Sequence, residues 1–213
     1  MSTATFQGSI TVGALRITAN LSKTGVGDEC HEPAMPAGVA GTLSTRTSDV
    51  AGVVTVGTGL GAGFTTGDIV AVFFDDSNGV PSVVYGKYAT VAGDAISIAD
   101  DIVAEYVGES PSGVVLPVED TVVVICKKTV SNVSADKDDV TFIAVGCDQP
   151  AIGIFGGAAE ICNFHIPVAA SPPAPWDLSG GAANPLTSDP TTLVCYNGGV
   201  VAATFQYGLL LAT

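Results

Sequence analysis

The chain has 213 residues, only 13% of them charged, and acidic residues outnumber basic residues 21 to 7. This length can bury a sizeable core without disulfide bonds or a structural metal, and the low charge argues against intrinsic disorder. The formal net charge of −14 argues against direct binding of DNA or RNA, because displacing phosphate counterions requires clustered lysine and arginine. We therefore expect a folded acidic protein that does not contact nucleic acid directly.

Cysteine usage and hydropathy bear on the compartment. The cysteines are odd in number, far apart and without a CxxC pair, which favours free buried thiols made in a reducing cytoplasm over a disulfide framework. They are Cys30, Cys126, Cys147, Cys162 and Cys195. The first residues lack the basic and apolar regions of a signal peptide, and no uninterrupted apolar run is long enough to span a bilayer. We expect synthesis in the cytoplasm and no membrane partner.

Strand patterns begin at the first residues. Residues 5–12 and 15–21 alternate around Gly13-Ala14, which predicts a hairpin. Further strands are predicted at 39–45, 50–56 and 68–74. Asn78-Gly79 then marks a turn into strands at 82–91 and 95–98.

The second half continues the pattern. Strands are predicted at 121–130 and 140–146, and a C-terminal hairpin at 191–196 and 200–211 is joined by Asn197-Gly198-Gly199. The best helical candidate is the short segment 100–107. The fold class is therefore all-β, a sandwich or barrel of short antiparallel strands with at most one or two short helices. We expect one domain over residues 1–213, with residues 1–35 as a candidate hairpin arm.

A long proline- and glycine-rich stretch at 167–190 interrupts this pattern and holds Trp176. Its lack of periodicity predicts an extended loop or arm near the C-terminus. One interpretation lays it over a neighbouring subunit with Trp176 as the anchor, and the other folds it back on its own domain. Either way, we expect Trp176 to be a contact residue.

The most chemically suggestive motif is GDECHEP at residues 27–33. Cys30 and His31 are adjacent, so their side chains diverge in an extended segment, and a zinc site would have to recruit His165 or another cysteine from a distance. We interpret the motif as a turn-rich connector. Its acids Asp28, Glu29 and Glu32 are then solvated loop residues, and Cys30 and His31 are packing or assembly contacts.

Other candidate chemistry is weaker. The run GTGLGA at 57–62 lacks the helix that a dinucleotide-binding fingerprint requires. His165 lies in the apolar segment 163–168, which favours a packing or interface role, and no serine or cysteine nucleophile motif accompanies it. Calcium at an acidic loop is the one cofactor alternative, on 75–78 or on Asp136, Asp138 and Asp139. We expect no catalytic, cofactor or metal residues, and hence no enzyme.

Three stretches resemble virion proteins of tailed bacteriophages and their prophages. They are PAGVAGTLSTRTSDVAGVVTV at 36–56, GDIVAVFF with VYGKYATVAGDAISI within 67–98, and LPVEDTVVVICKKT at 116–129. The resemblance covers about half of the chain. It implies a β-rich head or tail structural protein, made in the bacterial cytoplasm and incorporated into the virion, and it carries over no site residues.

These observations favour a non-enzymatic capsid decoration or cement protein. It would act as a homo-oligomer and contact other virion proteins such as the major capsid protein, with Trp176, Cys30, His31 and His165 as candidate assembly contacts. A tail-tube or other tail protein is the first alternative. A receptor- or glycan-binding surface β-sandwich is the second, although aromatic residues are only 7% of the chain.

Overall fold

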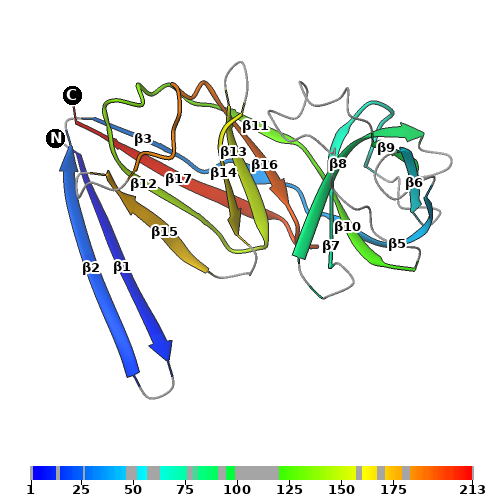
Figure 1. The fold of residues 1–213 in the computed structure, drawn as a ribbon, viewed down its shortest axis with the longest axis horizontal. Helices are drawn as coiled ribbons and strands as arrows, with labels where there is room; N and C mark the ends of the chain where they lie inside the picture. The colour runs from blue at the N-terminus through cyan, green and yellow to red at the C-terminus, as the bar shows by residue number, and fades with distance from the viewer. Residues whose placement is uncertain are drawn as a thin grey trace.

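Antiparallel strands dominate the computed structural model, which confirms the predicted all-β class (Figure 1). Alternation of apolar with small or polar residues is the local cause, because successive side chains of a strand point to opposite faces. The structure describes residues 2–12, 15–25, 27–46, 52–56, 63–75, 79, 81–90, 95–98, 120–156, 160–166, 171–178 and 183–212. The predicted helix at 100–107 and the glycine-rich run at 57–62 lie outside these residues.

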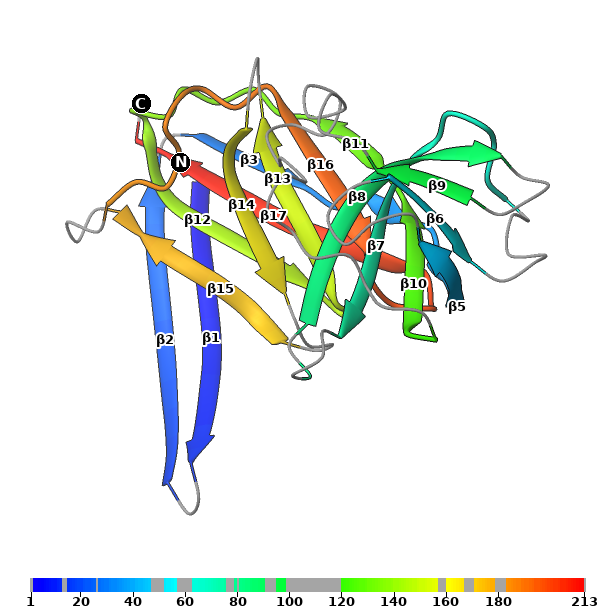
Figure 2. The same cartoon turned by 45° about the vertical axis from the view of Figure 1, so that its right-hand side comes forward.

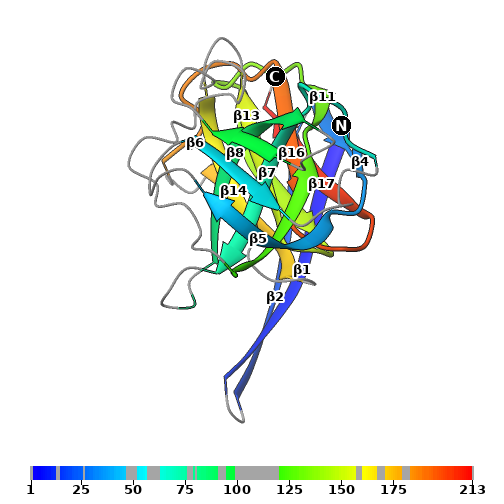
Figure 3. The same cartoon turned by 90° about the vertical axis from the view of Figure 1, so that its right-hand side faces the viewer.

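Six strands close into a barrel in the order β10-β5-β6-β9-β8-β7 (Figure 3). They are β5 (Val39–Arg46), β6 (Gly52–Val56), β7 (Ile69–Asp75), β8 (Pro81–Thr90), β9 (Ala95–Ile98) and β10 (Val122–Lys127). Every neighbouring pair is antiparallel, and closure leaves none of the six with an unpaired edge. The interior is filled by Leu43, Phe64, Val70, Val72, Phe74, Val84, Tyr88, Ile96, Val123 and Ile125.

Two further sheets lie beside the barrel. The four-stranded sheet has the order β11-β16-β13-β14, from β11 (Thr129–Asn132), β16 (Thr192–Asn197), β13 (Ala151–Gly156) and β14 (Glu160–Ile166). The five-stranded sheet has the order β15-β12-β17-β3, with β4 (Ala34–Met35) also paired to β17. Its other strands are β15 (Ser171–Asp177), β12 (Val140–Cys147), β17 (Ala203–Leu211) and β3 (Gly27–His31).

The four-stranded sheet is the middle of three layers, because alternate residues of β13 and β16 enter two different cores. One set packs against the five-stranded sheet, namely Ala151, Phe155, Leu193 and Cys195. The other set packs against the barrel, namely Ile152, Ile154, Val194 and Tyr196. From the barrel side, Ala71, Tyr85 and Cys126 are buried in that second core. Burial on both faces explains why these strands are continuous apolar runs.

The four-stranded and five-stranded sheets are in close contact at Gly153 on β13. Phe205 on β17 is fully buried, and a Cβ at position 153 would overlap its ring. Glycine therefore makes room for an aromatic ring from the opposing sheet.

A long hairpin projects from the five-stranded sheet. It consists of β1 (Ser2–Val12) and β2 (Leu15–Gly25), paired along their whole length, which confirms the predicted hairpin. Both strands approach β17, and all three views show the rest of the hairpin pointing away from the body (Figure 1, Figure 2, Figure 3). The candidate arm at 1–35 is therefore shorter in the structure, because residues 27–31 and 34–35 are strands of the body.

Three sequence predictions need correction. The predicted C-terminal hairpin is wrong, because β16 pairs with β11 and β13 whereas β17 pairs with β12, β3 and β4. The predicted strand at 121–130 divides into β10 in the barrel and β11 in the four-stranded sheet. In the proline-rich stretch at 167–190, which was expected to be a loop or arm, residues 171–177 form the strand β15; its pairing with β12 agrees with the interpretation that this stretch folds back on its own domain. Prolines are tolerated there because β15 is an edge strand and does not need every amide for the ladder.

Asn197 holds the crossing between β16 and β17. It is 1% exposed, and its side-chain amide donates to the carbonyl oxygens of Pro36 (2.9 Å) and Val201 (2.8 Å). Its Oδ1 atom accepts the Gly199 N–H at 2.9 Å. One buried side chain thus ties the turn to the segment that leads into the barrel.

A second polar cluster closes the loop before β7. The Asp68 carboxylate accepts the Thr65 N–H (2.8 Å) and hydroxyl (2.9 Å) and lies 2.6 Å from Lys127 Nζ. Lys127 Nζ also lies 5.4 Å from the centroid of the Phe64 ring, which stacks on Tyr88. Burial alone would raise the pKa of Asp68, but the hydrogen bonds from Lys127 and Thr65 outweigh it and hold the pKa below its ordinary value of 3.8.

We predict that Asn197→Ala lowers the free energy of unfolding by about 1–3 kcal/mol, because it leaves buried backbone groups without partners. Chemical denaturation measures the change. Asn132→Ala, at an exposed position on β11, is the control and should stay within about 0.5 kcal/mol of the wild type. Equal effects of the two substitutions would contradict the role of Asn197.

We also predict that Asp68→Asn lowers the melting temperature at pH 7. Because the folded-state pKa of Asp68 is lowered, its stabilisation is complete above the unfolded value near 3.8 and is lost as the pH falls through the folded value. The difference between wild type and variant should therefore shrink on acidification below pH 3.8, as thermal melts at several pH values would show. A difference that does not depend on pH would contradict this account.

Candidate functional site

The motif GDECHEP does not form a connector. Gly27–His31 is the strand β3, which pairs with β17 and ends the five-stranded sheet. Cys30 lies opposite Gly208 and His31 opposite Tyr207. The prediction of a turn-rich segment was wrong because the apolar strand β17 offers a free edge that no local pattern reveals.

Glu29 is not a solvated loop acid, because its carboxylate is hydrogen-bonded to the backbone of another sheet's edge; we call this contact the Glu29 clasp. Its side chain is 13% exposed, and both carboxylate oxygens accept the Ser134 N–H, at 2.9 and 3.0 Å. Ser134 follows β11, so this contact joins the edge of the five-stranded sheet to the chain leaving the edge of the four-stranded sheet. Hydrogen bonds to an ionised carboxylate are among the stronger ones. Glu32, in contrast, is exposed as predicted and accepts a hydrogen bond from Gln206 Nε2 at 3.0 Å.

His31 lies at the surface beside this clasp. Its ring stacks on Tyr207 with centroids 5.3 Å apart and an angle of 9°, and its Nε2 is 3.2 Å from Glu29 Oε1. The side chain is 44% exposed and borders an open depression of about 640 Å³. The depression is lined by His31, Glu32, Ala144, Val145, Gly146, Gln206, Tyr207 and Gly208. His31 can therefore contact a partner, while Glu29 is already engaged with the backbone.

The other predicted contact residues are spread over both sheets. His165 is on β14 opposite Ile152, and Trp176 is on β15 opposite Ile143. The structure thus does not bring His165 into the same sheet as Cys30 and His31. Within the described part of the chain, no three metal-ligating side chains gather in a group.

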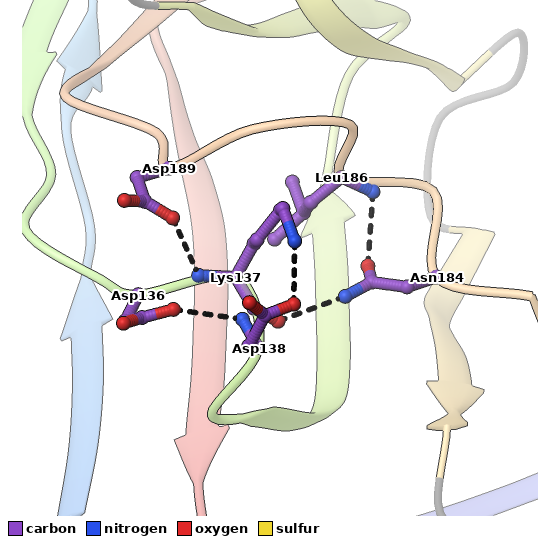
Figure 4. A network of polar contacts seen from close by, with 6 residues as sticks. All are labelled: Asp136, Lys137, Asp138, Asn184, Leu186 and Asp189. Carbon is purple, nitrogen blue, oxygen red and sulfur yellow. Dashed lines mark hydrogen bonds and ion pairs between the residues drawn. The ribbon is translucent and has the colours of Figure 1, made fainter.

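The acidic loop between β11 and β12 is organised by its own hydrogen bonds (Figure 4). Asp136 Oδ1 accepts the Asp138 N–H (2.9 Å), and Asp189 Oδ1 accepts the Lys137 N–H (3.0 Å). Asn184 Nδ2 donates to the Lys137 carbonyl oxygen at 2.9 Å. The hydrogen bond to Asp138 raises the pKa of Lys137 above its ordinary value. These contacts fasten the loop to residues 184–189, so the proposed calcium ligands Asp136 and Asp138 are engaged by backbone amides and Lys137.

The described cysteines are free thiols in packing positions. Cys126, Cys147 and Cys195 are buried and Cys162 is partly buried. Burial raises the pKa of the Cys126, Cys147 and Cys195 thiols, which keeps them protonated at neutral pH. They therefore lack the thiolate character of a nucleophile.

An apolar groove lies where the barrel meets the turn between β16 and β17. We call it the junction groove; its volume is about 360 Å³, and it is lined by Phe73, Phe74, Asp75, Pro81, Ser82, Thr121, Val122, Val124, Pro150 and Gly198. Val122 in this groove is 68% exposed. Val200 and Val201, which follow Gly198 in the same turn, are 56% and 59% exposed. Exposed valines beside an apolar groove are typical of a contact surface.

Sequence reasoning missed this groove. Its residues come from distant parts of the chain, and those in the strands β7, β8 and β10 mostly belong to apolar runs that a fully buried strand would also produce. The only local signal was apolar residues beside the turn residues Asn197-Gly198-Gly199.

Comparison with known proteins adds no assignment: no family model, curated protein or solved structure matches the chain. In the described residues, no helix has the length and apolar character needed to cross a bilayer.

We predict that Glu29→Ala lowers the free energy of unfolding by about 1–3 kcal/mol, because the Ser134 N–H loses a charged acceptor. Glu32→Ala removes an exposed acid of the same motif and should change it by less than about 0.5 kcal/mol. Chemical denaturation of both variants measures the difference. If Glu29→Ala proved as mild as Glu32→Ala, the clasp would contribute no stability.

Proposed function

We propose that the chain is a non-enzymatic structural protein of a virion, of the capsid decoration or cement type. The projecting hairpin β1–β2 is the observation that carries this proposal, because it extends beyond the body of its own chain (Figure 2). An arm that extends from a folded body can reach a neighbouring subunit, which suits a protein that assembles. The resemblance of three sequence stretches to phage virion proteins supports the same conclusion.

The proposed mechanism is bridging. A cement protein contacts neighbouring shell subunits and itself, and each contact contributes about 25 cal/mol per Å² of apolar surface removed from water. Repetition by the symmetry of the shell multiplies a modest contact into resistance against internal pressure. The partners are other copies and the major capsid protein. The acidic charge of −14 keeps the protein from binding the packaged nucleic acid.

A tail-tube protein is the second candidate, and the hairpin also favours it. An arm that reaches the next copy can close a ring around a lumen, and an acidic lumen would let DNA pass without binding. A glycan-binding function is less favoured, because none of the phenylalanine and tyrosine side chains whose burial is described is exposed.

Immunogold electron microscopy tests the proposal on particles released from the source bacterium. Antibodies raised against the purified chain should label heads at regular points, and mass spectrometry of purified particles should detect the chain. Label confined to tails would replace decoration with the tail candidate. Absence of the chain from all particles would contradict a virion role.

A further inference from the structure

The hairpin β1–β2 is amphipathic in its register. Directly paired residues of antiparallel strands share a face, and alternate pairs share the same one. One set of positions is mainly apolar: Ala4, Phe6, Ile10 and Val12 on β1, and Leu15, Ile17, Ala19 and Leu21 on β2. The same set also holds Gly8 opposite Ala19, Lys23 opposite Ala4, and the pair Ser2 and Gly25 at the open end of the hairpin. The other set holds Thr3, Thr5, Gln7, Ser9, Thr11, Arg16, Thr18, Asn20, Ser22 and Thr24. We call the first set the apolar face of the hairpin.

Among the described strands, β1 and β2 pair only with each other and form a two-stranded sheet of their own. The hairpin leaves the body near β17 and points away from it along most of its length (Figure 1, Figure 3). An isolated two-stranded hairpin is only marginally stable in water, and packing against another surface is what stabilises it. A surface from outside the chain's own body would therefore stabilise the projecting strands.

Charge identifies the body of a second copy as that surface. Residues 1–26 contain Arg16 and Lys23 and no acidic residue, whereas the remaining residues hold 5 basic and all 21 acidic residues. The formal charge is thus +2 on the hairpin and −16 on the rest of the chain. Two hairpins carry the same sign of charge and would repel each other, whereas a hairpin and the body of another copy carry opposite charges and attract each other.

The junction groove supplies the matching surface. Its lining is mostly apolar, Val122 within it is 68% exposed, and Asp75 adds a carboxylate that complements a basic arm. In Figure 1 the strands β7 and β10, which line the groove, lie in the barrel, whereas the hairpin projects from the opposite side of the two further sheets. In the conformation of the structure, an arm in this groove therefore comes from another copy.

We propose that the apolar face of the N-terminal hairpin docks in the junction groove of a second copy. The inference rests on the proposed assembly function and names its self-contact. Because the arm and the groove are different surfaces, the contact is heterologous, and it generates closed rings or open filaments. Eleven-residue strands span about 37 Å, so the face covers roughly 400 Å² per partner, which is small for a stable interface. Each contact is weak alone, and closure of a ring strengthens it.

Matched variants in the hairpin test the arm. Ile10→Ser with Ile17→Ser changes a directly facing pair on the apolar face, and Ser9→Ala with Thr18→Ala changes the neighbouring pair on the polar face. Sedimentation velocity of the full chain should show concentration-dependent oligomers for the wild type and for the polar-face variant. The apolar-face variant should sediment as a 21.2 kDa monomer, with association weakened roughly tenfold or more. Unchanged melting temperatures of the body would exclude misfolding.

Matched variants in the body test the groove. Val122→Asp places a charge in the groove, and Val130→Asp places one at a 52% exposed valine of β11 outside it. Val122→Asp should be monomeric and Val130→Asp should assemble like the wild type. A mixture of the apolar-face variant with Val122→Asp has one intact arm and one intact groove, and it should form a dimer that grows no further.

Three results would overturn the inference: oligomers that persist in the apolar-face variant, a mixture that stays monomeric, or a wild type that is monomeric at all concentrations. The last result together with gold-labelled particles would reject the arm contact and leave the virion role intact. Assembly in solution together with unlabelled particles would support the arm contact and reject the virion role.

Discussion

Burial of the four-stranded sheet on both faces is the constraint on which the rest of the structure depends. β13 and β16 send one set of residues toward the five-stranded sheet and the alternate set toward the barrel. Neither outer layer could keep its apolar face covered if this middle layer were absent. The same arrangement forces the chain to cross from β16 to β17 between layers, and buried Asn197 satisfies the backbone groups at that crossing.

Several acidic side chains that could have been catalytic or metal-binding candidates instead hydrogen-bond to backbone groups and connect parts of the fold. Glu29 joins the edges of two sheets through Ser134, and Asp136 and Asp189 fix the loop that carries Lys137. A carboxylate that accepts backbone amides is stabilised where it lies and is not available as a general base or metal ligand without losing those bonds. Surfaces left open for interaction include the apolar junction groove and the depression beside His31.

Much of the fold was predictable because strand signals are local. The hairpin around Gly13-Ala14 and the strand at 95–98 follow from alternation and turn residues. The pairing of β16 and β17 was not predictable, since an Asn-Gly-Gly turn is compatible both with a hairpin and with a crossing between sheets. Likewise, GDECHEP has no strand signal of its own and becomes β3 because β17 offers an edge. The candidate contacts Cys30, His31, His165 and Trp176 were chosen by residue type, and only His31 has a described, exposed side chain.

The sequence by itself determined the all-β class, the acidic balance and the contrast between a basic, alternating N-terminus and an acidic remainder, because composition and period-two alternation need no partner to be read. Tertiary structure alone decided which apolar runs are buried on both faces, which acids become clasps and where an apolar groove stays open. Those outcomes depend on pairings between residues far apart in the chain. In a strand, the same alternation serves a core, an interlayer contact or an exposed surface, and only its neighbours in space decide among them.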